Sequence, residues 1–197
     1  MSADALVLAT RNEGKLRELA RILRSQVIGL DEFPDAPDVP ETGATFEANA
    51  LLKARAIAEY TKLPAVADDS GLCVDALNGM PGVLSARWAG RHGADQANLD
   101  LLLAQVADVP DARLGARFVC AAALVVPGAG EWVTTGEVAG RLIREPRGSG
   151  GFGYDPIFLP DGFDLTTAEM TAEAKDAISH RGRAFRALAP YIQGSLT

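Results

Sequence analysis

The order of elements at the start of the chain constrains the fold most. Residues 6–10 form a short apolar run typical of a buried strand, residues 11–14 a polar turn, and residues 15–24 an amphipathic helix. A strand followed by a turn and a helix is the opening of an α/β fold. We therefore expect one α/β domain over residues 1–197, in which helices flank a mixed β-sheet and two lobes form a single inseparable unit.

The rest of the chain predicts further helices and strands. Apolar spacing predicts helices over residues 46–60 and 95–106, with Asp95 as a candidate N-cap of the second. Two apolar strands, 116–126 and 131–138, flank a Pro-Gly turn and predict an antiparallel hairpin. The remaining expected elements are strands near 27–30 and 156–159, two apolar pieces at 65–67 and 72–74, a helix carrying Lys175 after the capping-box pair Thr166 and Glu169, and a last helix with Phe185, Leu188 and Ile192 on one side.

Composition excludes several classes of protein. The chain has 26 acidic and 19 basic residues and a net charge of −7, so we expect no binding of nucleic acid or of an anionic membrane by bulk charge. The longest apolar run, residues 118–126, is too short to cross a bilayer, and no signal peptide is recognisable. Cys73 and Cys120 lie in strand-like sequence and are expected to be reduced core residues. These features predict a cytoplasmic protein.

The first turn is a candidate anion site. It consists of Thr10, Arg11, Asn12, Glu13, Gly14 and Lys15. The turn lies where a strand gives way to a helix, and the backbone N–H groups at a helix N-terminus attract phosphate. The segment lacks the spacing of a P-loop. The alternative is a solvated turn that only caps the helix.

Lysine is scarce, with four residues among the 19 basic side chains. Where arginine supplies most of the positive charge, each lysine is a candidate for a compact charge of the kind that suits a triphosphate, although codon bias gives the same ratio. Lys53 stands out because Asn49 lies one helical turn before it on the same face of an Ala-rich helix. The alternative is a lysine that simply reaches solvent.

Three carboxylates are candidates for chemistry. Asp68 and Asp69 follow an apolar strand, and successive strand side chains point to opposite faces, so the pair cannot share one proton as a catalytic dyad. Capping of a turn is the alternative for this pair. Glu41 lies in a loop rich in proline and glycine, where a carboxylate is usually solvated. Two carboxylates brought together from separate segments would suit Mg²⁺, which prefers oxygen ligands and keeps positions for water and phosphates.

The second half of the chain offers candidates for binding a flat ring. Phe152 and Tyr154 are aromatic residues in a glycine-rich stretch that ends at Asp155. Such rings stack on a nucleobase or pack against the domain core. Further on, His180 and Arg181 stand together and carry donors suited to carbonyl oxygens, while a helix cap or surface position is the alternative.

These motifs, taken in order, resemble those of the inosine triphosphate pyrophosphatase family, the XTP/dITP diphosphatases that remove deaminated purine nucleotides. The resemblance covers nearly the whole chain. It rests on Thr10-Arg11-Asn12-Glu13-Gly14-Lys15, Glu41-Thr42-Gly43, Phe46-Glu47-Ala48-Asn49-Ala50 with Lys53, Asp68-Asp69-Ser70-Gly71, Gly150-Gly151-Phe152-Gly153-Tyr154-Asp155-Pro156 and Ser179-His180-Arg181-Gly182.

The resemblance implies a homodimer in which each subunit holds its active site in a cleft between two lobes. It implies Mg²⁺-dependent hydrolysis between the α and β phosphates, with Glu41 and Asp69 serving the metal and Asp69 acting as the base for the attacking water. Residues 10–15 and Lys53 would bind the triphosphate. The residues expected to hold the rest of the nucleotide are Ser70, Phe152, Gly153, Tyr154, Asp155, Lys175, His180 and Arg181, with the aromatic loop and Arg181 closest to the base.

Two other functions remain open at this point. One is a Maf-like nucleotide pyrophosphatase, which performs related chemistry with a different base preference. The other is a non-catalytic regulator that binds nucleotides as a sensor. Release of pyrophosphate from ITP on addition of Mg²⁺ separates them, because a sensor gives none and a pyrimidine-preferring enzyme gives little.

Overall fold

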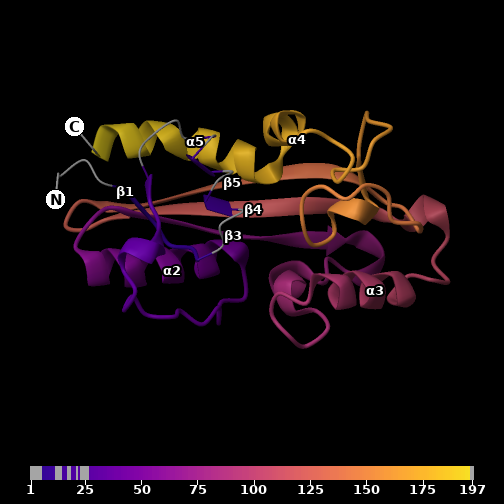
Figure 1. Ribbon diagram of the computed structural model, residues 1–197, viewed down its shortest axis with the longest axis horizontal. Helices are drawn as coiled ribbons and strands as arrows, with labels where there is room; N and C mark the ends of the chain where they lie inside the picture. The colour runs from indigo at the N-terminus through magenta and orange to yellow at the C-terminus, as the bar shows by residue number, and fades with distance from the viewer. Residues whose placement is uncertain (1–5, 12–14, 17–18, 21, 23–26, 196–197) are drawn as a thin grey trace. The chain divides into compact units, whose positions relative to one another are not determined.

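Six strands form one sheet in the part of the chain that the structure describes (Figure 1). The computed structural model describes residues 6–11, 15–16, 19–20, 22 and 27–195. The strands are β1 (Leu6–Leu8), β2 (Val27–Ile28), β3 (Ala65–Val74), β4 (Gly115–Val126), β5 (Gly130–Leu142) and β6 (Phe158–Pro160). Their spatial order is β2-β1-β3-β4-β5-β6.

The sheet is mixed. Strand β1 runs parallel to both β2 and β3, with Val7 opposite Ala65 in the second pair. Strands β4 and β5 are neighbours joined by residues 127–129, which is the predicted hairpin, and β5 runs antiparallel to β6. The predicted α/β class with a mixed sheet is therefore confirmed.

Helices follow the predicted spacing closely. The described helices are α2 (Phe46–Thr61), α3 (Asp95–Gln105), α4 (Ala172–Ile178) and α5 (His180–Ser195), with 3₁₀ turns at Leu30–Glu32, Asp75–Leu77, Gly82–Arg87, Asp111–Arg113 and Asp155–Ile157. Helix α2 begins after Thr45, whose side-chain oxygen accepts the N–H of Ala48 at 3.2 Å and so caps the helix. Of the helix expected over residues 15–24, all described residues are helical.

The chain divides into two compact units. Unit 1 takes its described residues from Met1–Asp69, Cys120–Gly136 and His180–Thr197, and unit 2 takes Ser70–Val119 and Glu137–Ser179. The polypeptide therefore passes between the units four times. The expectation of one inseparable domain with a cleft between two lobes stays a prediction.

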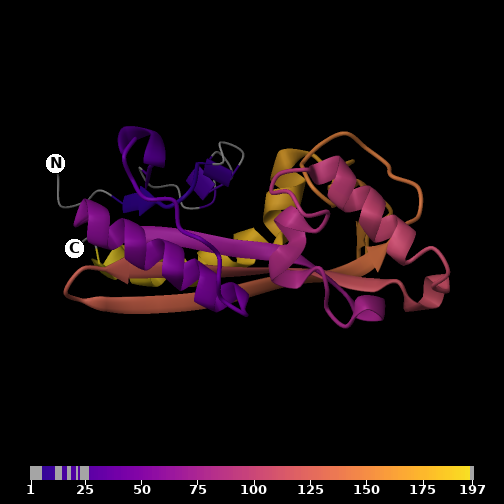
Figure 2. The same cartoon turned by 90° about the horizontal axis from the view of Figure 1, so that it is seen from below.

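Unit 1 is a layered arrangement of helices on a sheet. Helices α2 and α5 lie on opposite faces of its strands (Figures 1 and 2). On the α5 face, Phe185 and Leu188 pack in one buried cluster with Val66 of β3 and Cys120 of β4. Because successive side chains of a strand point to opposite faces, the packing of Val66 against α5 determines which residues of β3 face α5 and which face α2.

Unit 2 has its own core. Leu99 and Leu102 of α3 pack there with Leu72 of β3 and with aromatic residues of β4 and β6. Strand β3 passes unusually close to the 3₁₀ turn at Gly82–Arg87, because a Cβ on Gly71 would lie 2.5 Å from the Oγ of Ser85. Only glycine allows that approach.

The acidic pair is placed differently from the prediction. Asp68 and Asp69 lie inside β3, which runs without a break from Ala65 to Val74, and not at the end of a strand. The strand continues through two buried carboxylates because neighbouring side chains from both sheet faces compensate them, as described below. The shared helical face of Asn49 and Lys53 was predicted, but its position beside Asp69 was not.

Two predicted helix starts are also corrected. Helix α3 begins with Asp95 as a helical residue and not as its cap, and the carboxylate instead accepts the N–H of Gly153 at 3.0 Å. Glu169 does accept the N–H of Thr166, as in a capping box, but this bond closes a turn. Helix α4 starts later and is capped by Thr171.

Both cysteines are buried thiols, as expected. Within the described ranges, none of the helices has the length and apolar character needed to cross a bilayer.

Candidate functional site

Asp68 lies between two cations of unit 1. The Nζ of Lys15 is 3.0 Å from its Oδ2, and the Nε of Arg181, at the start of α5, is 3.1 Å from the same oxygen. The side chains of Asp68 and Arg181 are each only 2% exposed. Burial opposes the charge on Asp68, but the two cations outweigh it and hold the pKa of the carboxyl well below its usual range.

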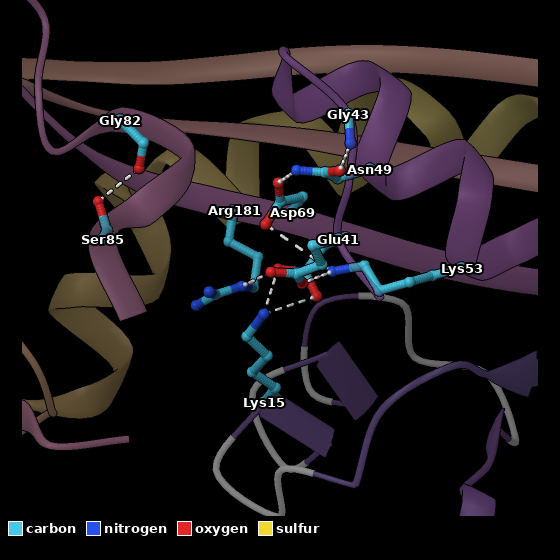
Figure 3. A network of polar contacts seen from close by, with 10 residues as sticks. Lys15, Glu41, Gly43, Asn49, Lys53, Asp69, Gly82, Ser85 and Arg181 are labelled. Atoms are coloured by element: carbon cyan, nitrogen blue, oxygen red, sulfur yellow. Dashed lines mark hydrogen bonds and ion pairs between the residues drawn. The ribbon is translucent and has the colours of Figure 1, made fainter. Parts of the chain in front are cut away.

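Asp69 points to the opposite face of β3, toward α2, as strand alternation requires. The Nδ2 of Asn49 donates to its Oδ2 at 2.9 Å, and the Nζ of Lys53 lies 3.8 Å from its Oδ1. Lys53 also donates to the Oε1 of Glu41 at 2.6 Å. One ammonium group thus reaches both of the carboxylates predicted to serve a metal (Figure 3).

The charges around Asp69 oppose one another. Burial, reinforced by the negative charge of Glu41, raises the pKa of Asp69 despite the contributions of Lys53 and Asn49. Burial alone would lower the pKa of Lys53, but the surrounding carboxylates raise it. Lys53 therefore stays charged, and Asp69 is a carboxylate that accepts a proton more readily than an ordinary aspartate.

The donors at this place fit a hard divalent cation. Glu41 and Asp69 offer carboxylate oxygens, and the Lys53 ammonium between them shows that the place attracts positive charge. No group of three or more His, Cys, Asp or Glu side chains suited to a metal occurs in the described ranges. Carboxylate oxygens are the ligands that hard divalent cations prefer.

The glycine-rich loop of unit 2 is built around a third buried carboxylate, that of Asp155. Asp155 accepts the backbone N–H of Phe152 at 2.8 Å, the Nζ of Lys175 at 2.6 Å and the Oγ1 of Thr167 at 2.8 Å. Three of the predicted nucleotide-binding residues, Phe152, Asp155 and Lys175, are thereby brought together. In this arrangement Asp155 holds the loop and Lys175 in place.

The two aromatic residues of the loop have different surroundings. Tyr154 lies in the core of unit 2, where its hydroxyl donates to the carbonyl oxygen of Ser85 at 2.9 Å and burial raises its pKa. Phe152 is 42% exposed, and the Nζ of Lys175 lies 5.2 Å from its ring centre. Phe152 is therefore the aromatic ring that the loop presents at the surface, and Tyr154 anchors the loop.

Arg11 lies apart from the two charged clusters. Its guanidinium donates to the carbonyl oxygen of Ala36 at 2.8 Å and forms an ion pair with Asp38 at 3.6 Å. It thus contacts the proline-rich passage between β2 and α2.

The other predicted site residues are scattered over both units. Thr10 follows β1 and Ser70 lies in β3, both half-buried, while His180 is buried at the first position of α5. The backbone N–H of Gly153 donates a hydrogen bond to the carboxylate of Asp95. The predicted residues Asn12, Glu13 and Gly14 lie outside the described residues.

Asn49 and Asp68 were not among the residues predicted to bind the metal or the nucleotide, but both contact residues that were. Asn49 is completely buried in α2, although it is polar, and it contacts Asp69 directly. A polar amide within an apolar, Ala-rich face was the signal that could have found it. For Asp68, the partners are distant in sequence, since 113 positions separate it from Arg181.

Comparison with known proteins places the chain among nucleotide hydrolases. The model of the Ham1 family matches residues 6–191. A dITP/XTP pyrophosphatase of Streptomyces coelicolor is 62% identical over 193 residues, which cover 95% of this chain and 96% of that protein. The crystal structure of a nucleoside-triphosphatase / dITP/XTP pyrophosphatase from Mycobacterium abscessus has a TM-score of 0.78 at 57% identity, covering 94% of this chain and 99% of that one. A HAM1 protein from Coxiella burnetii has a TM-score of 0.88 at 41% identity, covering 98% and 100%.

Proposed function

The chain belongs to the Ham1 family, and from that membership we propose that it hydrolyses non-standard purine nucleoside triphosphates, ITP, dITP and XTP, to the monophosphate and pyrophosphate. The observation that carries the proposal is the partly buried group of Glu41, Lys53 and Asp69 in a chain 62% identical to a named dITP/XTP pyrophosphatase. The reaction removes deaminated purines from the nucleotide pool.

Glu41 and Asp69 would hold Mg²⁺ in this proposal. The fit rests on two carboxylates that share one cation, since carboxylate oxygens are ligands that Mg²⁺ prefers. A bound Mg²⁺ would neutralise charge on the triphosphate.

Asp69 is the proposed base. As the oxygen of a water molecule attacks the α-phosphorus, Asp69 takes its proton, the bond from that phosphorus to the α–β bridging oxygen breaks, and pyrophosphate leaves. The position of Asp69 supports this assignment, because its carboxylate lies beside Lys53 and so next to Glu41, the groups proposed to hold the triphosphate and the metal.

The remaining residues would bind and orient the nucleotide. Lys15, Lys53 and the other residues of segment 10–15 would hold the triphosphate, since concentrated positive charge is what phosphoryl chemistry needs from a protein. The proposed contacts to the rest of the nucleotide are those of Ser70, Phe152, Gly153, Tyr154, Asp155, Lys175, His180 and Arg181.

Selectivity for a 6-oxo purine is assigned to Arg181 in this proposal. A guanidinium only donates hydrogen bonds, so the 6-carbonyl of ITP satisfies it and the 6-amino group of ATP does not. A buried polar mismatch of this kind can reject a substrate by roughly 10⁴-fold.

Pyrophosphate release tests the function directly. ITP, XTP and ATP are compared under identical Mg²⁺, and we expect ITP and XTP to be hydrolysed far faster than ATP. Absence of pyrophosphate from ITP would favour a sensor, and a preference for pyrimidines a Maf-like enzyme. The ratio of kcat/KM for ITP to that for ATP in Arg181→Ala then tests the assigned readout, because a general loss of stability lowers both values alike.

We also propose a cytoplasmic homodimer that needs no nucleic acid. A pool-cleansing enzyme acts where nucleotides are polymerised, and the resemblance of the motifs extends to a dimeric family. Light scattering coupled to gel filtration should give twice the 20.7 kDa mass of the chain.

A further inference from the structure

The side chain of Asn49 joins two segments that carry the reactive carboxylates. It is completely buried in α2. Its Nδ2 donates to the Oδ2 of Asp69 at 2.9 Å, and its Oδ1 accepts the backbone N–H of Gly43 at 2.7 Å. Gly43 lies two residues after Glu41, so a single amide is bonded to the loop of one carboxylate and to the other carboxylate itself (Figure 3).

We propose that Asn49 is a positioning residue that sets the separation and orientation of Glu41 and Asp69 for metal binding and catalysis. This inference rests on the proposed function of the same site. Asn49 itself touches neither metal nor substrate in this proposal. It acts by holding Oδ2 of Asp69, which leaves Oδ1 directed at Lys53.

The chemistry of the two bonds requires an amide. The side chain must donate to a carboxylate and accept from a backbone N–H at the same time, and the amide of asparagine does so with two separate atoms, Nδ2 and Oδ1. An aspartate at this position would accept from Gly43 but place a second negative charge against Asp69. A leucine of similar size would leave the N–H and the carboxylate oxygen without this partner in a buried place.

The close approach at Gly43 shows that the tether is tight. A Cβ on Gly43 would lie 2.7 Å from the Oδ1 of Asn49 and 2.7 Å from the Cβ of Ala48. Neither neighbour is the end of a long flexible side chain, so either the loop or the amide must move. The Gly43→Ala variant therefore disturbs the same tether without removing any polar side chain.

A purely structural role for Asn49 would predict something different. If the amide only secured α2, its loss would lower stability and leave metal affinity in the folded protein unchanged. Groups that orient metal ligands typically change metal affinity or activity by about 10–100-fold when removed. Metal affinity is therefore the measurement that separates the two roles.

The experiment compares Asn49→Ala, Gly43→Ala and the double variant with Thr45→Ala as a matched control. Thr45 caps the same helix and loosens it when truncated, but it contacts no carboxylate. Mn²⁺ alone serves as the probe: its binding to the nucleotide-free protein is followed by electron paramagnetic resonance, and circular dichroism reports folding. Steady-state kinetics with ITP then give kcat and KM separately.

We expect each tether variant to weaken Mn²⁺ binding about 10-fold or more and to lower kcat by a similar factor, with KM for ITP changed less. The double variant should be little worse than either single one, because both break the same tether. Thr45→Ala should bind Mn²⁺ as wild type does. If either folded tether variant binds Mn²⁺ like Thr45→Ala, the positioning role is wrong.

Failure of the proposed function would be seen separately. If the wild type released no pyrophosphate from ITP, the substrate assignment would fall, while Mn²⁺ binding without nucleotide would still test the role of Asn49. Conversely, normal ITP hydrolysis with unchanged Mn²⁺ affinity in the variants would overturn only the inference about Asn49.

Discussion

The charged cluster of unit 1 and the glycine-rich loop of unit 2 both contain ion pairs, but they differ in what the buried carboxylate holds. In unit 1, charged side chains are neutralised by other side chains: Asp68 is paired with Arg181, and Lys53 with Glu41. In unit 2, the carboxylate of Asp155 is paired with Lys175 but also accepts the backbone N–H of Phe152, and so it fixes the loop that carries an exposed ring.

The difference corresponds to two kinds of task. Phosphate chemistry needs charges that are ordered before the substrate arrives, and a buried network of ion pairs provides that order. Recognition of a flat base needs an exposed apolar ring, and a well-anchored backbone keeps such a ring in place although it is exposed to water. We therefore expect changes in unit 1 to lower kcat or stability and changes in the loop to raise KM.

The largest expected effect is that of Asp69→Asn. The amide keeps the shape of the side chain but cannot take a proton, so kcat for ITP should fall by roughly 10³-fold or more, while nucleotide binding survives. Rapid-quench turnover and calorimetric binding measure the two quantities. Retention of turnover within a factor of ten would remove Asp69 as the base.

Asp68→Asn should act mainly on stability. It leaves the buried Arg181 and the nearby Lys15 facing a neutral amide, and loss of one partner from a buried pair costs about 3–5 kcal/mol. Urea unfolding of the variant measures this loss. A fully stable Asp68→Asn protein with the catalytic defect of Asp69→Asn would mean that both carboxylates serve the reaction.

Phe152→Ala tests the loop. Stacking of a base on an aromatic ring is worth roughly 1–3 kcal/mol, so KM for ITP should rise about 10-fold with kcat changed little. Phe163, which is 44% exposed in the same unit but lies outside the loop, supplies the control Phe163→Ala. Equal changes in KM for the two variants would contradict a role for Phe152 in base binding.

The smallest effect is expected at an exposed ion pair of unit 1. Arg55 donates to both carboxylate oxygens of Glu131, at 2.8 and 2.6 Å, and these bonds lower the pKa of Glu131. Because the folded pKa is the lower one, the contribution is present above the unfolded pKa of about 4.3 and is lost as the pH falls through the folded value. Glu131→Gln should cost less than about 1 kcal/mol at pH 7. A larger loss of stability would show that the difference in burial does not explain why the Arg55–Glu131 pair contributes less than the Asp68–Arg181 pair.

The parts of the molecule that could be predicted are those determined by local pattern. The helix spacing over residues 46–60, the hairpin and the opposite orientations of Asp68 and Asp69 follow from periods of 3.6 and 2 residues. The pairing of Asn49 and Lys53 on one helical face was likewise readable, and both do contact Asp69. The homodimer, the Mg²⁺ and the assigned roles of the site residues stay predictions.

Other features depend on distant contacts and could not be predicted. The sequence does not predict that an apolar strand continues through two aspartates. The strand can do so because Lys15 and Arg181, which are distant in the sequence, lie beside Asp68. Tyr154 and Phe152 belong to one loop, but Tyr154 lies in the core of unit 2, where its hydroxyl donates to the carbonyl oxygen of Ser85, and Phe152 is exposed. No periodicity in the sequence encodes such pairings.

The long separation between Asp68 and Arg181 bears on the order in which the protein can be completed during synthesis. Arg181 is made 113 residues after Asp68, and every residue of unit 2 precedes α5 in the chain. A nascent chain thus carries all of unit 2 before the helix that compensates Asp68 leaves the ribosome. The charged centre is therefore among the last parts to assemble, because Arg181 can compensate Asp68 only when the chain is nearly complete.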